Sequence, residues 1–123
     1  MSQSSSFVRI GAAPSGELEM TPWPWNAADA LLAEGMTPVG AKSYEGRGLT
    51  LGAWACNKGA VEIRGHAVDE ACFVTRGSVT LTDSEGRSET FAAGEAFLLP
   101  RGFKGVWSQS DNFMKLFVAI SRD

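Results

Sequence analysis

The sequence has few of the residues on which metal and redox sites are commonly built: one histidine and two cysteines among 123 residues. The single histidine, His66, excludes a cluster of histidine ligands and a two-histidine acid–base pair within one chain. Cys56 and Cys72 do not form a Cys-x-x-Cys motif, and we interpret them as free thiols. Neither a phosphate-binding loop nor a dinucleotide-binding fingerprint is present.

Long apolar runs and clusters of basic residues are also missing. No run approaches the ~18 apolar residues that a membrane-spanning helix needs. The net charge of −3, without a basic stretch, argues against a nucleic-acid surface. Residues 1–6 have neither the positive region nor the apolar core of a signal peptide. We therefore expect a cytoplasmic protein that binds neither nucleic acid nor membrane.

What the sequence does contain predicts one globular domain. Hydrophobic residues make up 44% of the chain and charged residues 20%, which is ordinary for a folded domain of this length. We divide the chain into a weakly ordered arm (1–20), an extended Trp/Pro segment with a short helix that packs on a barrel (21–47), and a single barrel (48–123).

The segment before residue 48 carries two aromatic residues between prolines. Residues 21–25 read Thr-Pro-Trp-Pro-Trp and should be extended, because proline fixes φ and restricts the residue before it. Trp23 and Trp25 should pack the arm onto the barrel or onto a second subunit. Asn26 resembles a helix cap and Gly35 a terminator, which predicts a helix over 27–34. A short strand is expected over 7–10.

From residue 48 onward, short strands alternate with Gly, Asp, Ser and Pro. Residues 83–86, Asp-Ser-Glu-Gly, predict a hairpin turn, and 113–120 is apolar apart from Lys115, which suits a strand covered on both faces. Many short strands predict an all-β sandwich or barrel. The expected strands are 49–56, 60–65, 71–75, 78–83, 88–91, 96–99, 105–109 and 113–121.

Two glycine-bounded motifs lie in this region. The first is Arg64-Gly65-His66-Ala67-Val68-Asp69-Glu70, followed after six residues by Gly77; the second runs from Gly94 through Pro100 and Gly102 to Gly105. They resemble the cupin motifs His-x-His-x(3,4)-Glu-x6-Gly and Gly-x5-Pro-x-Gly-x2-His. The resemblance implies a double-stranded β-helix, the jelly-roll barrel of cupins, with an extended N-terminal arm. His66 and Glu70 match two of the four usual metal ligands, whereas Arg64 and Gly105 replace histidines.

A closer resemblance is to the cupin subfamily that includes ureidoglycine aminohydrolase and the ethanolamine-utilisation Q protein. It rests on Gly52-Ala53-Trp54, on residues 69–74 and on residues 102–107. The aminohydrolase holds manganese with Glu, two His and Gln, and only His66 keeps its ligand type here. The resemblance also implies a homodimer, for which Trp23 and Trp25 are the candidate contacts.

Alternation along a strand places residues two apart on one side. We therefore expect Arg64 and His66 to face the barrel interior, with Glu70 across the turn. Gly105, Trp107 and Gln109 should lie on the opposing strand. A fixed positive charge at position 64 would repel a divalent ion at ~5 Å by about 6–7 kcal/mol at an effective dielectric constant near 20. No tightly bound cofactor is therefore expected.

Three functions remain open. In the first, the pocket binds a small carboxylate-bearing molecule through Arg64, flanked by Trp54 and Trp107, with His66, Glu70 and Gln109 lining it; alternatively, Arg64 only balances acidic neighbours. In the second, His66 and Glu70 hold manganese, zinc or nickel in an aminohydrolase-like enzyme, with Glu62 or Gln109 as a further ligand. In the third, the protein is a non-catalytic accessory or interaction subunit.

Two further residues have both a structural and a catalytic interpretation. His66 is either a satisfied core residue or a general base oriented by Glu70. Cys72 is either an inert buried thiol or a nucleophile beside His66.

Overall fold

The structure is a computed structural model, and it describes residues 7–13, 16 and 18–121. Residues 1–6, 14–15 and 17 of the predicted arm lie outside the described residues. Within the described part, the chain forms strands and no helix, so no helix is present that could span a membrane.

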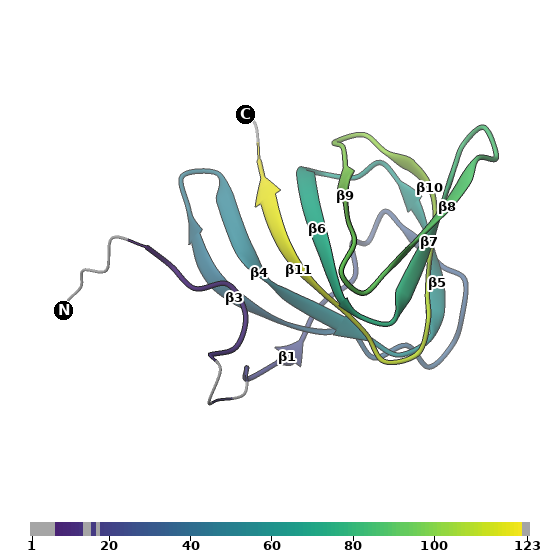
Figure 1. Cartoon of the computed structure of the whole chain (residues 1–123). Helices are drawn as coiled ribbons and strands as arrows, with labels where there is room; N and C mark the ends of the chain where they lie inside the picture. The colour runs from purple at the N-terminus through teal and green to yellow at the C-terminus, as the bar shows by residue number, and fades with distance from the viewer. Residues whose placement is uncertain (1–6, 14–15, 17, 122–123) are drawn as a thin grey trace.

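Two antiparallel sheets face each other and enclose the core (Figure 1). Their neighbouring strands come from distant parts of the chain, because the chain passes repeatedly from one sheet to the other. The six-stranded sheet contains, in spatial order, β1 (Thr21–Pro22), β3 (Val39–Gly46), β4 (Leu49–Cys56), β11 (Phe113–Ile120), β6 (Asp69–Arg76) and β9 (Ala96–Leu99). The five-stranded sheet contains β2 (Ala30–Leu31), β5 (Gly59–Arg64), β10 (Lys104–Gln109), β7 (Ser78–Asp83) and β8 (Ser88–Ala92). The predicted all-β architecture is confirmed.

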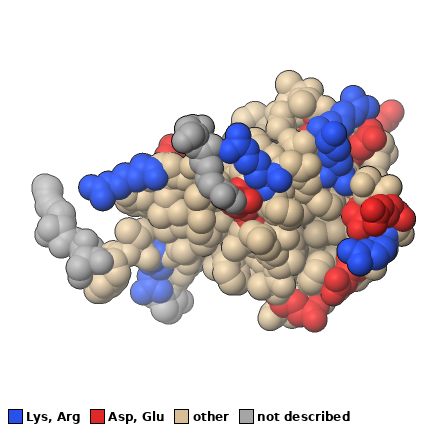
Figure 2. Space-filling model, turned by 90° about the horizontal axis from the view of Figure 1, so that it is seen from above, with Lys and Arg blue, Asp and Glu red and all other residues tan. Residues whose placement is uncertain are grey.

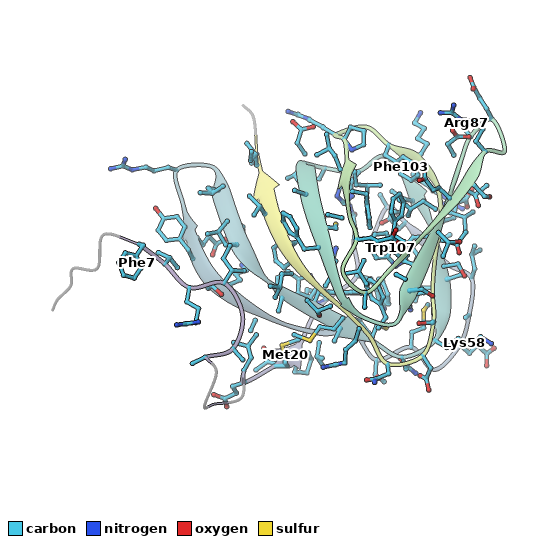
Figure 3. All side chains as sticks on the ribbon, viewed as in Figure 1. Phe7, Met20, Lys58, Arg87, Phe103 and Trp107 are labelled. Atoms are coloured by element: carbon cyan, nitrogen blue, oxygen red, sulfur yellow. The ribbon has the colours of Figure 1, made fainter. Side chains whose placement is uncertain are left out.

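Aromatic rings fill the space between the sheets. Trp54 of β4 contacts Trp107 of β10 edge to face, with ring centroids 6.1 Å apart, and Trp107 contacts Phe113 at 5.8 Å. Such edge-to-face pairs add about 0.5–1.5 kcal/mol to the burial of their area. Trp107 lies inside the barrel, whereas Phe7 extends along the arm away from it (Figure 3). Aromatic contacts therefore join the two sheets.

The helix predicted over 27–34 is wrong. Asn26 instead makes a turn, in which its side-chain oxygen accepts the N–H of Ala28 and its carbonyl accepts the N–H of Asp29, both at 3.0 Å. The chain then forms β2, which pairs with β5 through Ala30 and Leu31. A helix of eight residues is marginal on its own, whereas this segment can bond to the open edge of β5.

Two further differences lie before residue 48. The strand predicted over 7–10 is absent, and β3, which was not predicted, pairs with β4 along most of its length. A bulge between Lys42 and Tyr44 interrupts the alternation of β3 and hides its strand pattern in the sequence. Because β1, β2 and β3 belong to the two sheets, the sheets begin earlier than the boundary predicted at residue 48.

Candidate functional site

One end of the barrel holds a pocket of about 350 Å³, a size that suits a small organic ligand. Exposed residues of the Trp/Pro segment, Pro24 and Asn26, lie at its rim, and the barrel interior forms its walls. All four tryptophans of the chain line it, namely Trp23, Trp25, Trp54 and Trp107. Four indole rings, with the ring of Phe117, therefore contribute to the pocket wall.

The Trp/Pro segment closes part of this pocket. Trp23 packs edge to face on Phe117, with centroids 5.9 Å apart, and Trp25 packs in the same way on Trp54 at 6.0 Å. Gly40 of β3 makes room for Trp23, because a Cβ atom at position 40 would lie 2.3 Å from Cε3 of that ring. The tryptophans thus pack the segment onto the barrel of their own chain, one of the two roles predicted for them.

Lys115 brings a positive charge into the pocket from the middle of β11. It pairs in register with Trp54 of β4 and Val74 of β6, and its side chain points to the inner face, where only 10% of it is exposed. Its ammonium nitrogen lies 4.7 Å from the ring centroid of Trp107 and 5.4 Å from that of Trp54. Contacts of this kind stabilise a desolvated ammonium by about 0.5–2 kcal/mol each.

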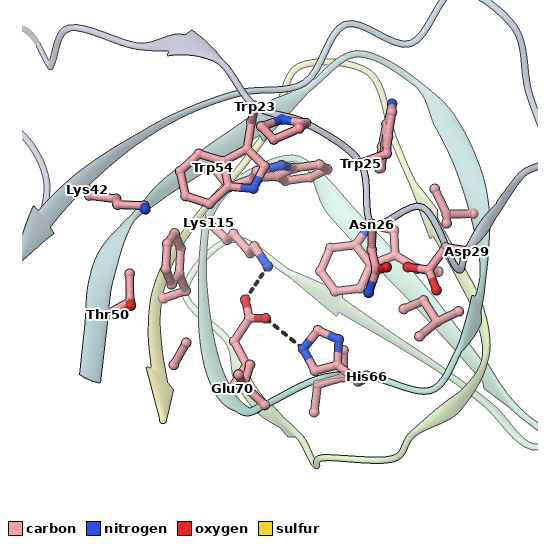
Figure 4. Close-up of a pocket in the computed structure, with 18 residues that line it drawn as sticks. Trp23, Trp25, Asn26, Asp29, Lys42, Thr50, Trp54, His66, Glu70 and Lys115 are labelled. Atoms are coloured by element: carbon pink, nitrogen blue, oxygen red, sulfur yellow. Dashed lines mark hydrogen bonds and ion pairs between the residues drawn. The ribbon is translucent and has the colours of Figure 1, made fainter. Parts of the chain in front are cut away.

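Lys115, Glu70 and His66 form a connected polar chain at the inner end of the pocket (Figure 4). The Lys115 ammonium forms an ion pair with Oε2 of Glu70, and Nε2 of His66 lies 2.8 Å from Oε1 of the same carboxylate. Cys72 lies behind this chain, with its sulfur 3.3 Å from Oε2. Both oxygens of Glu70 therefore have partners, and its charge is compensated within the pocket.

The protonation states follow from burial and from this pairing. Burial alone would raise the pKa of Glu70, but the Lys115 ammonium and the hydrogen bond from His66 together hold it well below its ordinary value of 4.5. Burial would lower the pKa of Lys115, whereas the charge of Glu70 raises it, and the net direction is upward. The pair is thus an ammonium and a carboxylate.

His66 is held from the backbone as well as from its ring. Its N–H donates to the carbonyl of Phe103 at 3.0 Å, and its carbonyl accepts the N–H of Gly102 at 2.8 Å. Because the ionised Glu70 accepts a hydrogen bond from Nε2–H, a neutral imidazole has an unprotonated Nδ1. No described residue hydrogen-bonds to that Nδ1, so it is available as an acceptor in the pocket.

Arg64 does not face the interior, so its predicted place in the pocket wall is wrong. Its guanidinium side chain is 57% exposed and pairs with Glu62 at 3.0 Å on the outer face of the five-stranded sheet. The inward residues of β5 are Val61 and Ile63. Gly65, with φ of 135°, interrupts the alternation after β5, so Arg64 and His66 do not share a face.

The remaining predicted residues divide between the pocket and the core. Trp54, Trp107, His66 and Glu70 line the pocket as expected. Gln109 is buried beneath it, where it accepts a hydrogen bond from Nε1 of Trp107 at 2.9 Å and donates one to the Asn57 carbonyl at 2.8 Å. Both ends of the Gln109 amide are therefore used within the core rather than offered to a ligand.

The residues at the cupin metal positions do not fit a divalent ion. Position 105 has no side chain, and Cζ of Phe103 lies 2.9 Å from where a Cβ atom of residue 105 would stand. Of the two ligands that remain, Glu70 already pairs with the Lys115 ammonium. Within the described residues, no group of three His, Cys, Asp or Glu side chains converges. A divalent ion commonly needs at least three protein ligands, so this set of side chains does not suit manganese, zinc or nickel.

The sequence reasoning missed Lys115 as a pocket residue, although the signal was present. Lys115 is the only charged residue between positions 113 and 120, and it alternates with Phe113 and Phe117. Those two aromatic residues are buried on the inner face, so strand alternation also places Lys115 there. A charged residue that alternates with buried aromatic residues along one strand thus indicates a charge inside the barrel.

Comparisons with known proteins agree with this architecture. Comparison with curated proteins finds no match. Among solved structures, a Pseudomonas syringae pv. tomato protein of unknown function is 19% identical with a TM-score of 0.75, over 83% of this chain but only 44% of that protein. The Clostridium difficile EutQ protein is 19% identical with a TM-score of 0.63, over 72% of this chain and 71% of that protein.

A third similar structure is ethanolamine utilization protein Q from Salmonella typhimurium LT2, 16% identical with a TM-score of 0.59, over 72% of this chain and 71% of that protein. Identities this low establish a shared fold and nothing about activity. The family assignment rests on the sequence itself: residues 45–117, more than half of the chain, match the EutQ-like cupin domain. The chain therefore belongs to the EutQ-like cupin family.

Proposed function

We propose that this protein binds a small carboxylate-bearing organic molecule in the barrel pocket, with Lys115 as the group that recognises the carboxylate. The observation that carries the proposal is a buried ammonium that faces an aromatic cavity and lacks a full set of acceptors. An ammonium has three N–H donors. Among the described residues, Lys115 has one oxygen acceptor, on Glu70, and a weak sulfur contact to Cys72 at 3.7 Å.

A ligand carboxylate would supply the hydrogen-bond acceptors that the Lys115 ammonium lacks. A buried donor without an acceptor costs ~1–3 kcal/mol, and a charge-assisted hydrogen bond restores about as much. Repulsion from Glu70 is reduced because both of its oxygens are already bound, one by Lys115 and the other by His66. Lys115 therefore takes the role predicted for Arg64, which lies outside the pocket.

The tryptophans favour a ligand with a flat or apolar body. Trp54 and Trp107 stand beside Lys115, and Trp23 and Trp25 stand nearer the rim. The combination of a mostly apolar wall with a few convergent polar groups is typical of small-molecule sites. A carboxylate end at Lys115 with an apolar or aromatic remainder against the indole rings would match both parts.

A catalytic step on the bound molecule is a second candidate, favoured by the His66–Glu70 hydrogen bond of 2.8 Å. A carboxylate that holds Nε2–H leaves Nδ1 as the acceptor, which is the arrangement of an oriented general base. If His66 acts in this way, His66→Gln should bind the acid but form no product from it.

The test of binding is a fluorescence and calorimetric titration of the purified protein. Because every tryptophan lines the pocket, indole emission reports occupancy directly. The panel pairs small aliphatic and aromatic carboxylic acids with their primary amides, which have similar shape and no charge. We expect some acids to bind roughly 10- to 100-fold more tightly than their amides, the value of one charge-assisted hydrogen bond.

Variants assign the effect to Lys115. Lys115→Met/Glu70→Gln removes the pair without leaving a bare buried charge, and it should abolish the preference for acids over amides. Arg64→Ala is the matched control, since it removes a cation from the outer face and should leave binding unchanged. Equal affinity for acids and amides, or an unchanged preference in the Lys115 variant, would contradict the proposal.

A further inference from the structure

Asp29 places a second carboxylate at the rim of the barrel pocket. It is half-buried between the Asn26 turn and β2, and it lines the cavity on the side opposite Lys42 (Figure 4). Its Oδ1 accepts the backbone N–H of Arg64 at 3.0 Å. Within the described part of the chain, its Oδ2 has no hydrogen-bond partner, and none of the ion pairs includes Asp29. One oxygen of this carboxylate is therefore open to a ligand.

The cations around Asp29 are held by other carboxylates. The Arg64 guanidinium lies on the outer face of the five-stranded sheet, where it pairs with Glu62 at 3.0 Å. Lys42, across the opening of the pocket, pairs with Glu45 at 3.2 Å. Neither cation compensates the charge of Asp29.

The two carboxylates that line the pocket thus differ. Glu70 is paired with the Lys115 ammonium, whereas Asp29 has no such partner among the described residues. Outside the pocket, Figure 2 shows acidic and basic side chains beside one another at the end of the molecule that carries the β7–β8 hairpin, so no broad field of one sign covers that end. The charge balance of the pocket therefore lacks one positive group, at Asp29.

Asp29 and Lys115 lie at separate places in the pocket. The Lys115 ammonium is 4.7 Å from the ring centroid of Trp107, which pairs in register with Val61. Arg64, whose N–H holds Asp29, is three residues farther along β5, which corresponds to about 10 Å at ~3.4 Å per residue. A ligand that contacts both charged groups therefore needs an extended body between its own two polar ends.

We infer that the ligand carries an ammonium group at the end of its body opposite the carboxylate, and that Asp29 selects for it. The inference rests on the proposed carboxylate site at Lys115. An α-amino acid has its ammonium and its carboxylate on one carbon, so it cannot reach both Lys115 and Asp29. The ligand class is therefore an amino acid of the ω type, in which an apolar or aromatic body separates the two charges and lies against the indole rings.

The contact with Asp29 should contribute less than the contact with Lys115. Asp29 is half-buried, so water screens an ion pair there more than at the buried Lys115, although less than on an open surface. We expect the ammonium to tighten binding by about 5- to 10-fold.

The test is a calorimetric and fluorescence titration with acids that differ at one end only. The probes are para-aminomethylbenzoate, para-hydroxymethylbenzoate and para-methylbenzoate, with para-methylbenzamide to test the carboxylate site by itself. The aminomethyl acid should bind about 5- to 10-fold more tightly than the other two acids. Phenylalanine should bind no more tightly than phenylpropanoate, because its ammonium lies next to its carboxylate.

Asp29→Asn separates recognition from a structural role. The asparagine keeps Oδ1 as the acceptor for the N–H of Arg64 and loses the charge, so the fold should be retained, which circular dichroism would check. The variant should lose the preference for the aminomethyl acid and keep the preference for the methyl acid over its amide. Asp111→Asn is the matched control: Asp111 also accepts a backbone N–H, that of Lys58 at 3.2 Å, and lies outside the pocket. It should change neither preference.

Equal affinity for the aminomethyl and methyl acids, or for the aminomethyl and hydroxymethyl acids, would overturn the inference. An unchanged preference in Asp29→Asn, or the same gain for phenylalanine over phenylpropanoate, would do so as well. None of these results would affect the carboxylate site at Lys115. Equal affinity of the wild type for para-methylbenzoate and para-methylbenzamide would instead contradict the proposed function, and the inference with it.

Discussion

Replacing Lys115 by methionine removes the ammonium beside Glu70 and keeps a side chain of similar length. The Lys115 and Glu70 side chains are 10% and 9% exposed, so water cannot compensate the carboxylate that remains. At an effective dielectric constant of 20, unit charges about 4 Å apart attract by ~4 kcal/mol. Breaking a buried pair by removing one partner costs about 3–5 kcal/mol. We expect Lys115→Met to lose this much free energy of unfolding at pH 7.

The dependence on pH separates loss of charge compensation from loss of packing. In the wild type the pKa of Glu70 lies well below 4.5, so the unfolded chain takes up this proton first as the pH falls. The contribution of the pair is therefore present at neutral pH and is lost below about pH 4.5 as the pH approaches the folded-state pKa. In Lys115→Met, burial dominates and should raise the pKa of Glu70 above 4.5. The folded variant then takes up the proton first and gains stability as the pH falls.

Urea unfolding of both proteins at pH 7 and at about pH 5 measures this difference. The gap in stability should narrow at the lower pH, and Lys115→Met/Glu70→Gln should recover most of the loss at pH 7. Lys104→Met, an exposed lysine at the start of β10, is the control and should change stability by less than about 0.5 kcal/mol. A loss below ~1 kcal/mol, or one that is the same at both pH values, would refute the reasoning.

Two other residues give direct tests of packing. Burial raises the pKa of the Cys72 thiol to about 12, further raised by Glu70 and only partly opposed by Lys115. Cys72 and Cys56 are both buried, so neither should react with a thiol reagent in the native protein. Both should react after denaturation. Fewer than two reactive thiols in the denatured protein would contradict the assignment of two free cysteines. Gly40→Ala would place a Cβ atom 2.3 Å from the Trp23 ring, which should shift tryptophan emission to longer wavelength and destabilise the protein by about 1–3 kcal/mol. Gly16→Ala, with open space around it, should change neither.

The strands after residue 48 could be predicted from the sequence because local signals define them. The predictions for 49–56, 78–83 and 96–99 coincide with β4, β7 and β9, and glycine or a charged turn follows or precedes each. The residues before 48 could not be assigned in this way. Their structure depends on pairing with β4 and β5, which are brought to them only by the folded barrel. Helix propensity over 27–34 was therefore overridden by tertiary contacts.

Side-chain direction at the site was harder to predict than the strands. A one-residue change of phase reverses the face of every side chain, and Gly65 introduces such a change between Arg64 and His66. The spacing of the motif alone therefore does not predict which of these side chains point into the barrel and which point to solvent. The inward-facing side of β11 could be predicted more reliably, because Phe113 and Phe117 are large aromatic residues that are buried on that side.

Lys115 also explains how the barrel keeps an ionised carboxylate without the ligand set of the cupin motif. A buried carboxylate needs a compensating charge, and in a metal-binding cupin the ion supplies it. Here the ammonium enters from β11, on the side of the pocket opposite the motif's missing histidines, and pairs with Glu70 directly. A metal ion between His66 and Glu70 would be repelled by this ammonium and would compete with it for the carboxylate. The same residue therefore makes the motif unsuited to a cation and is the basis of the proposed carboxylate site.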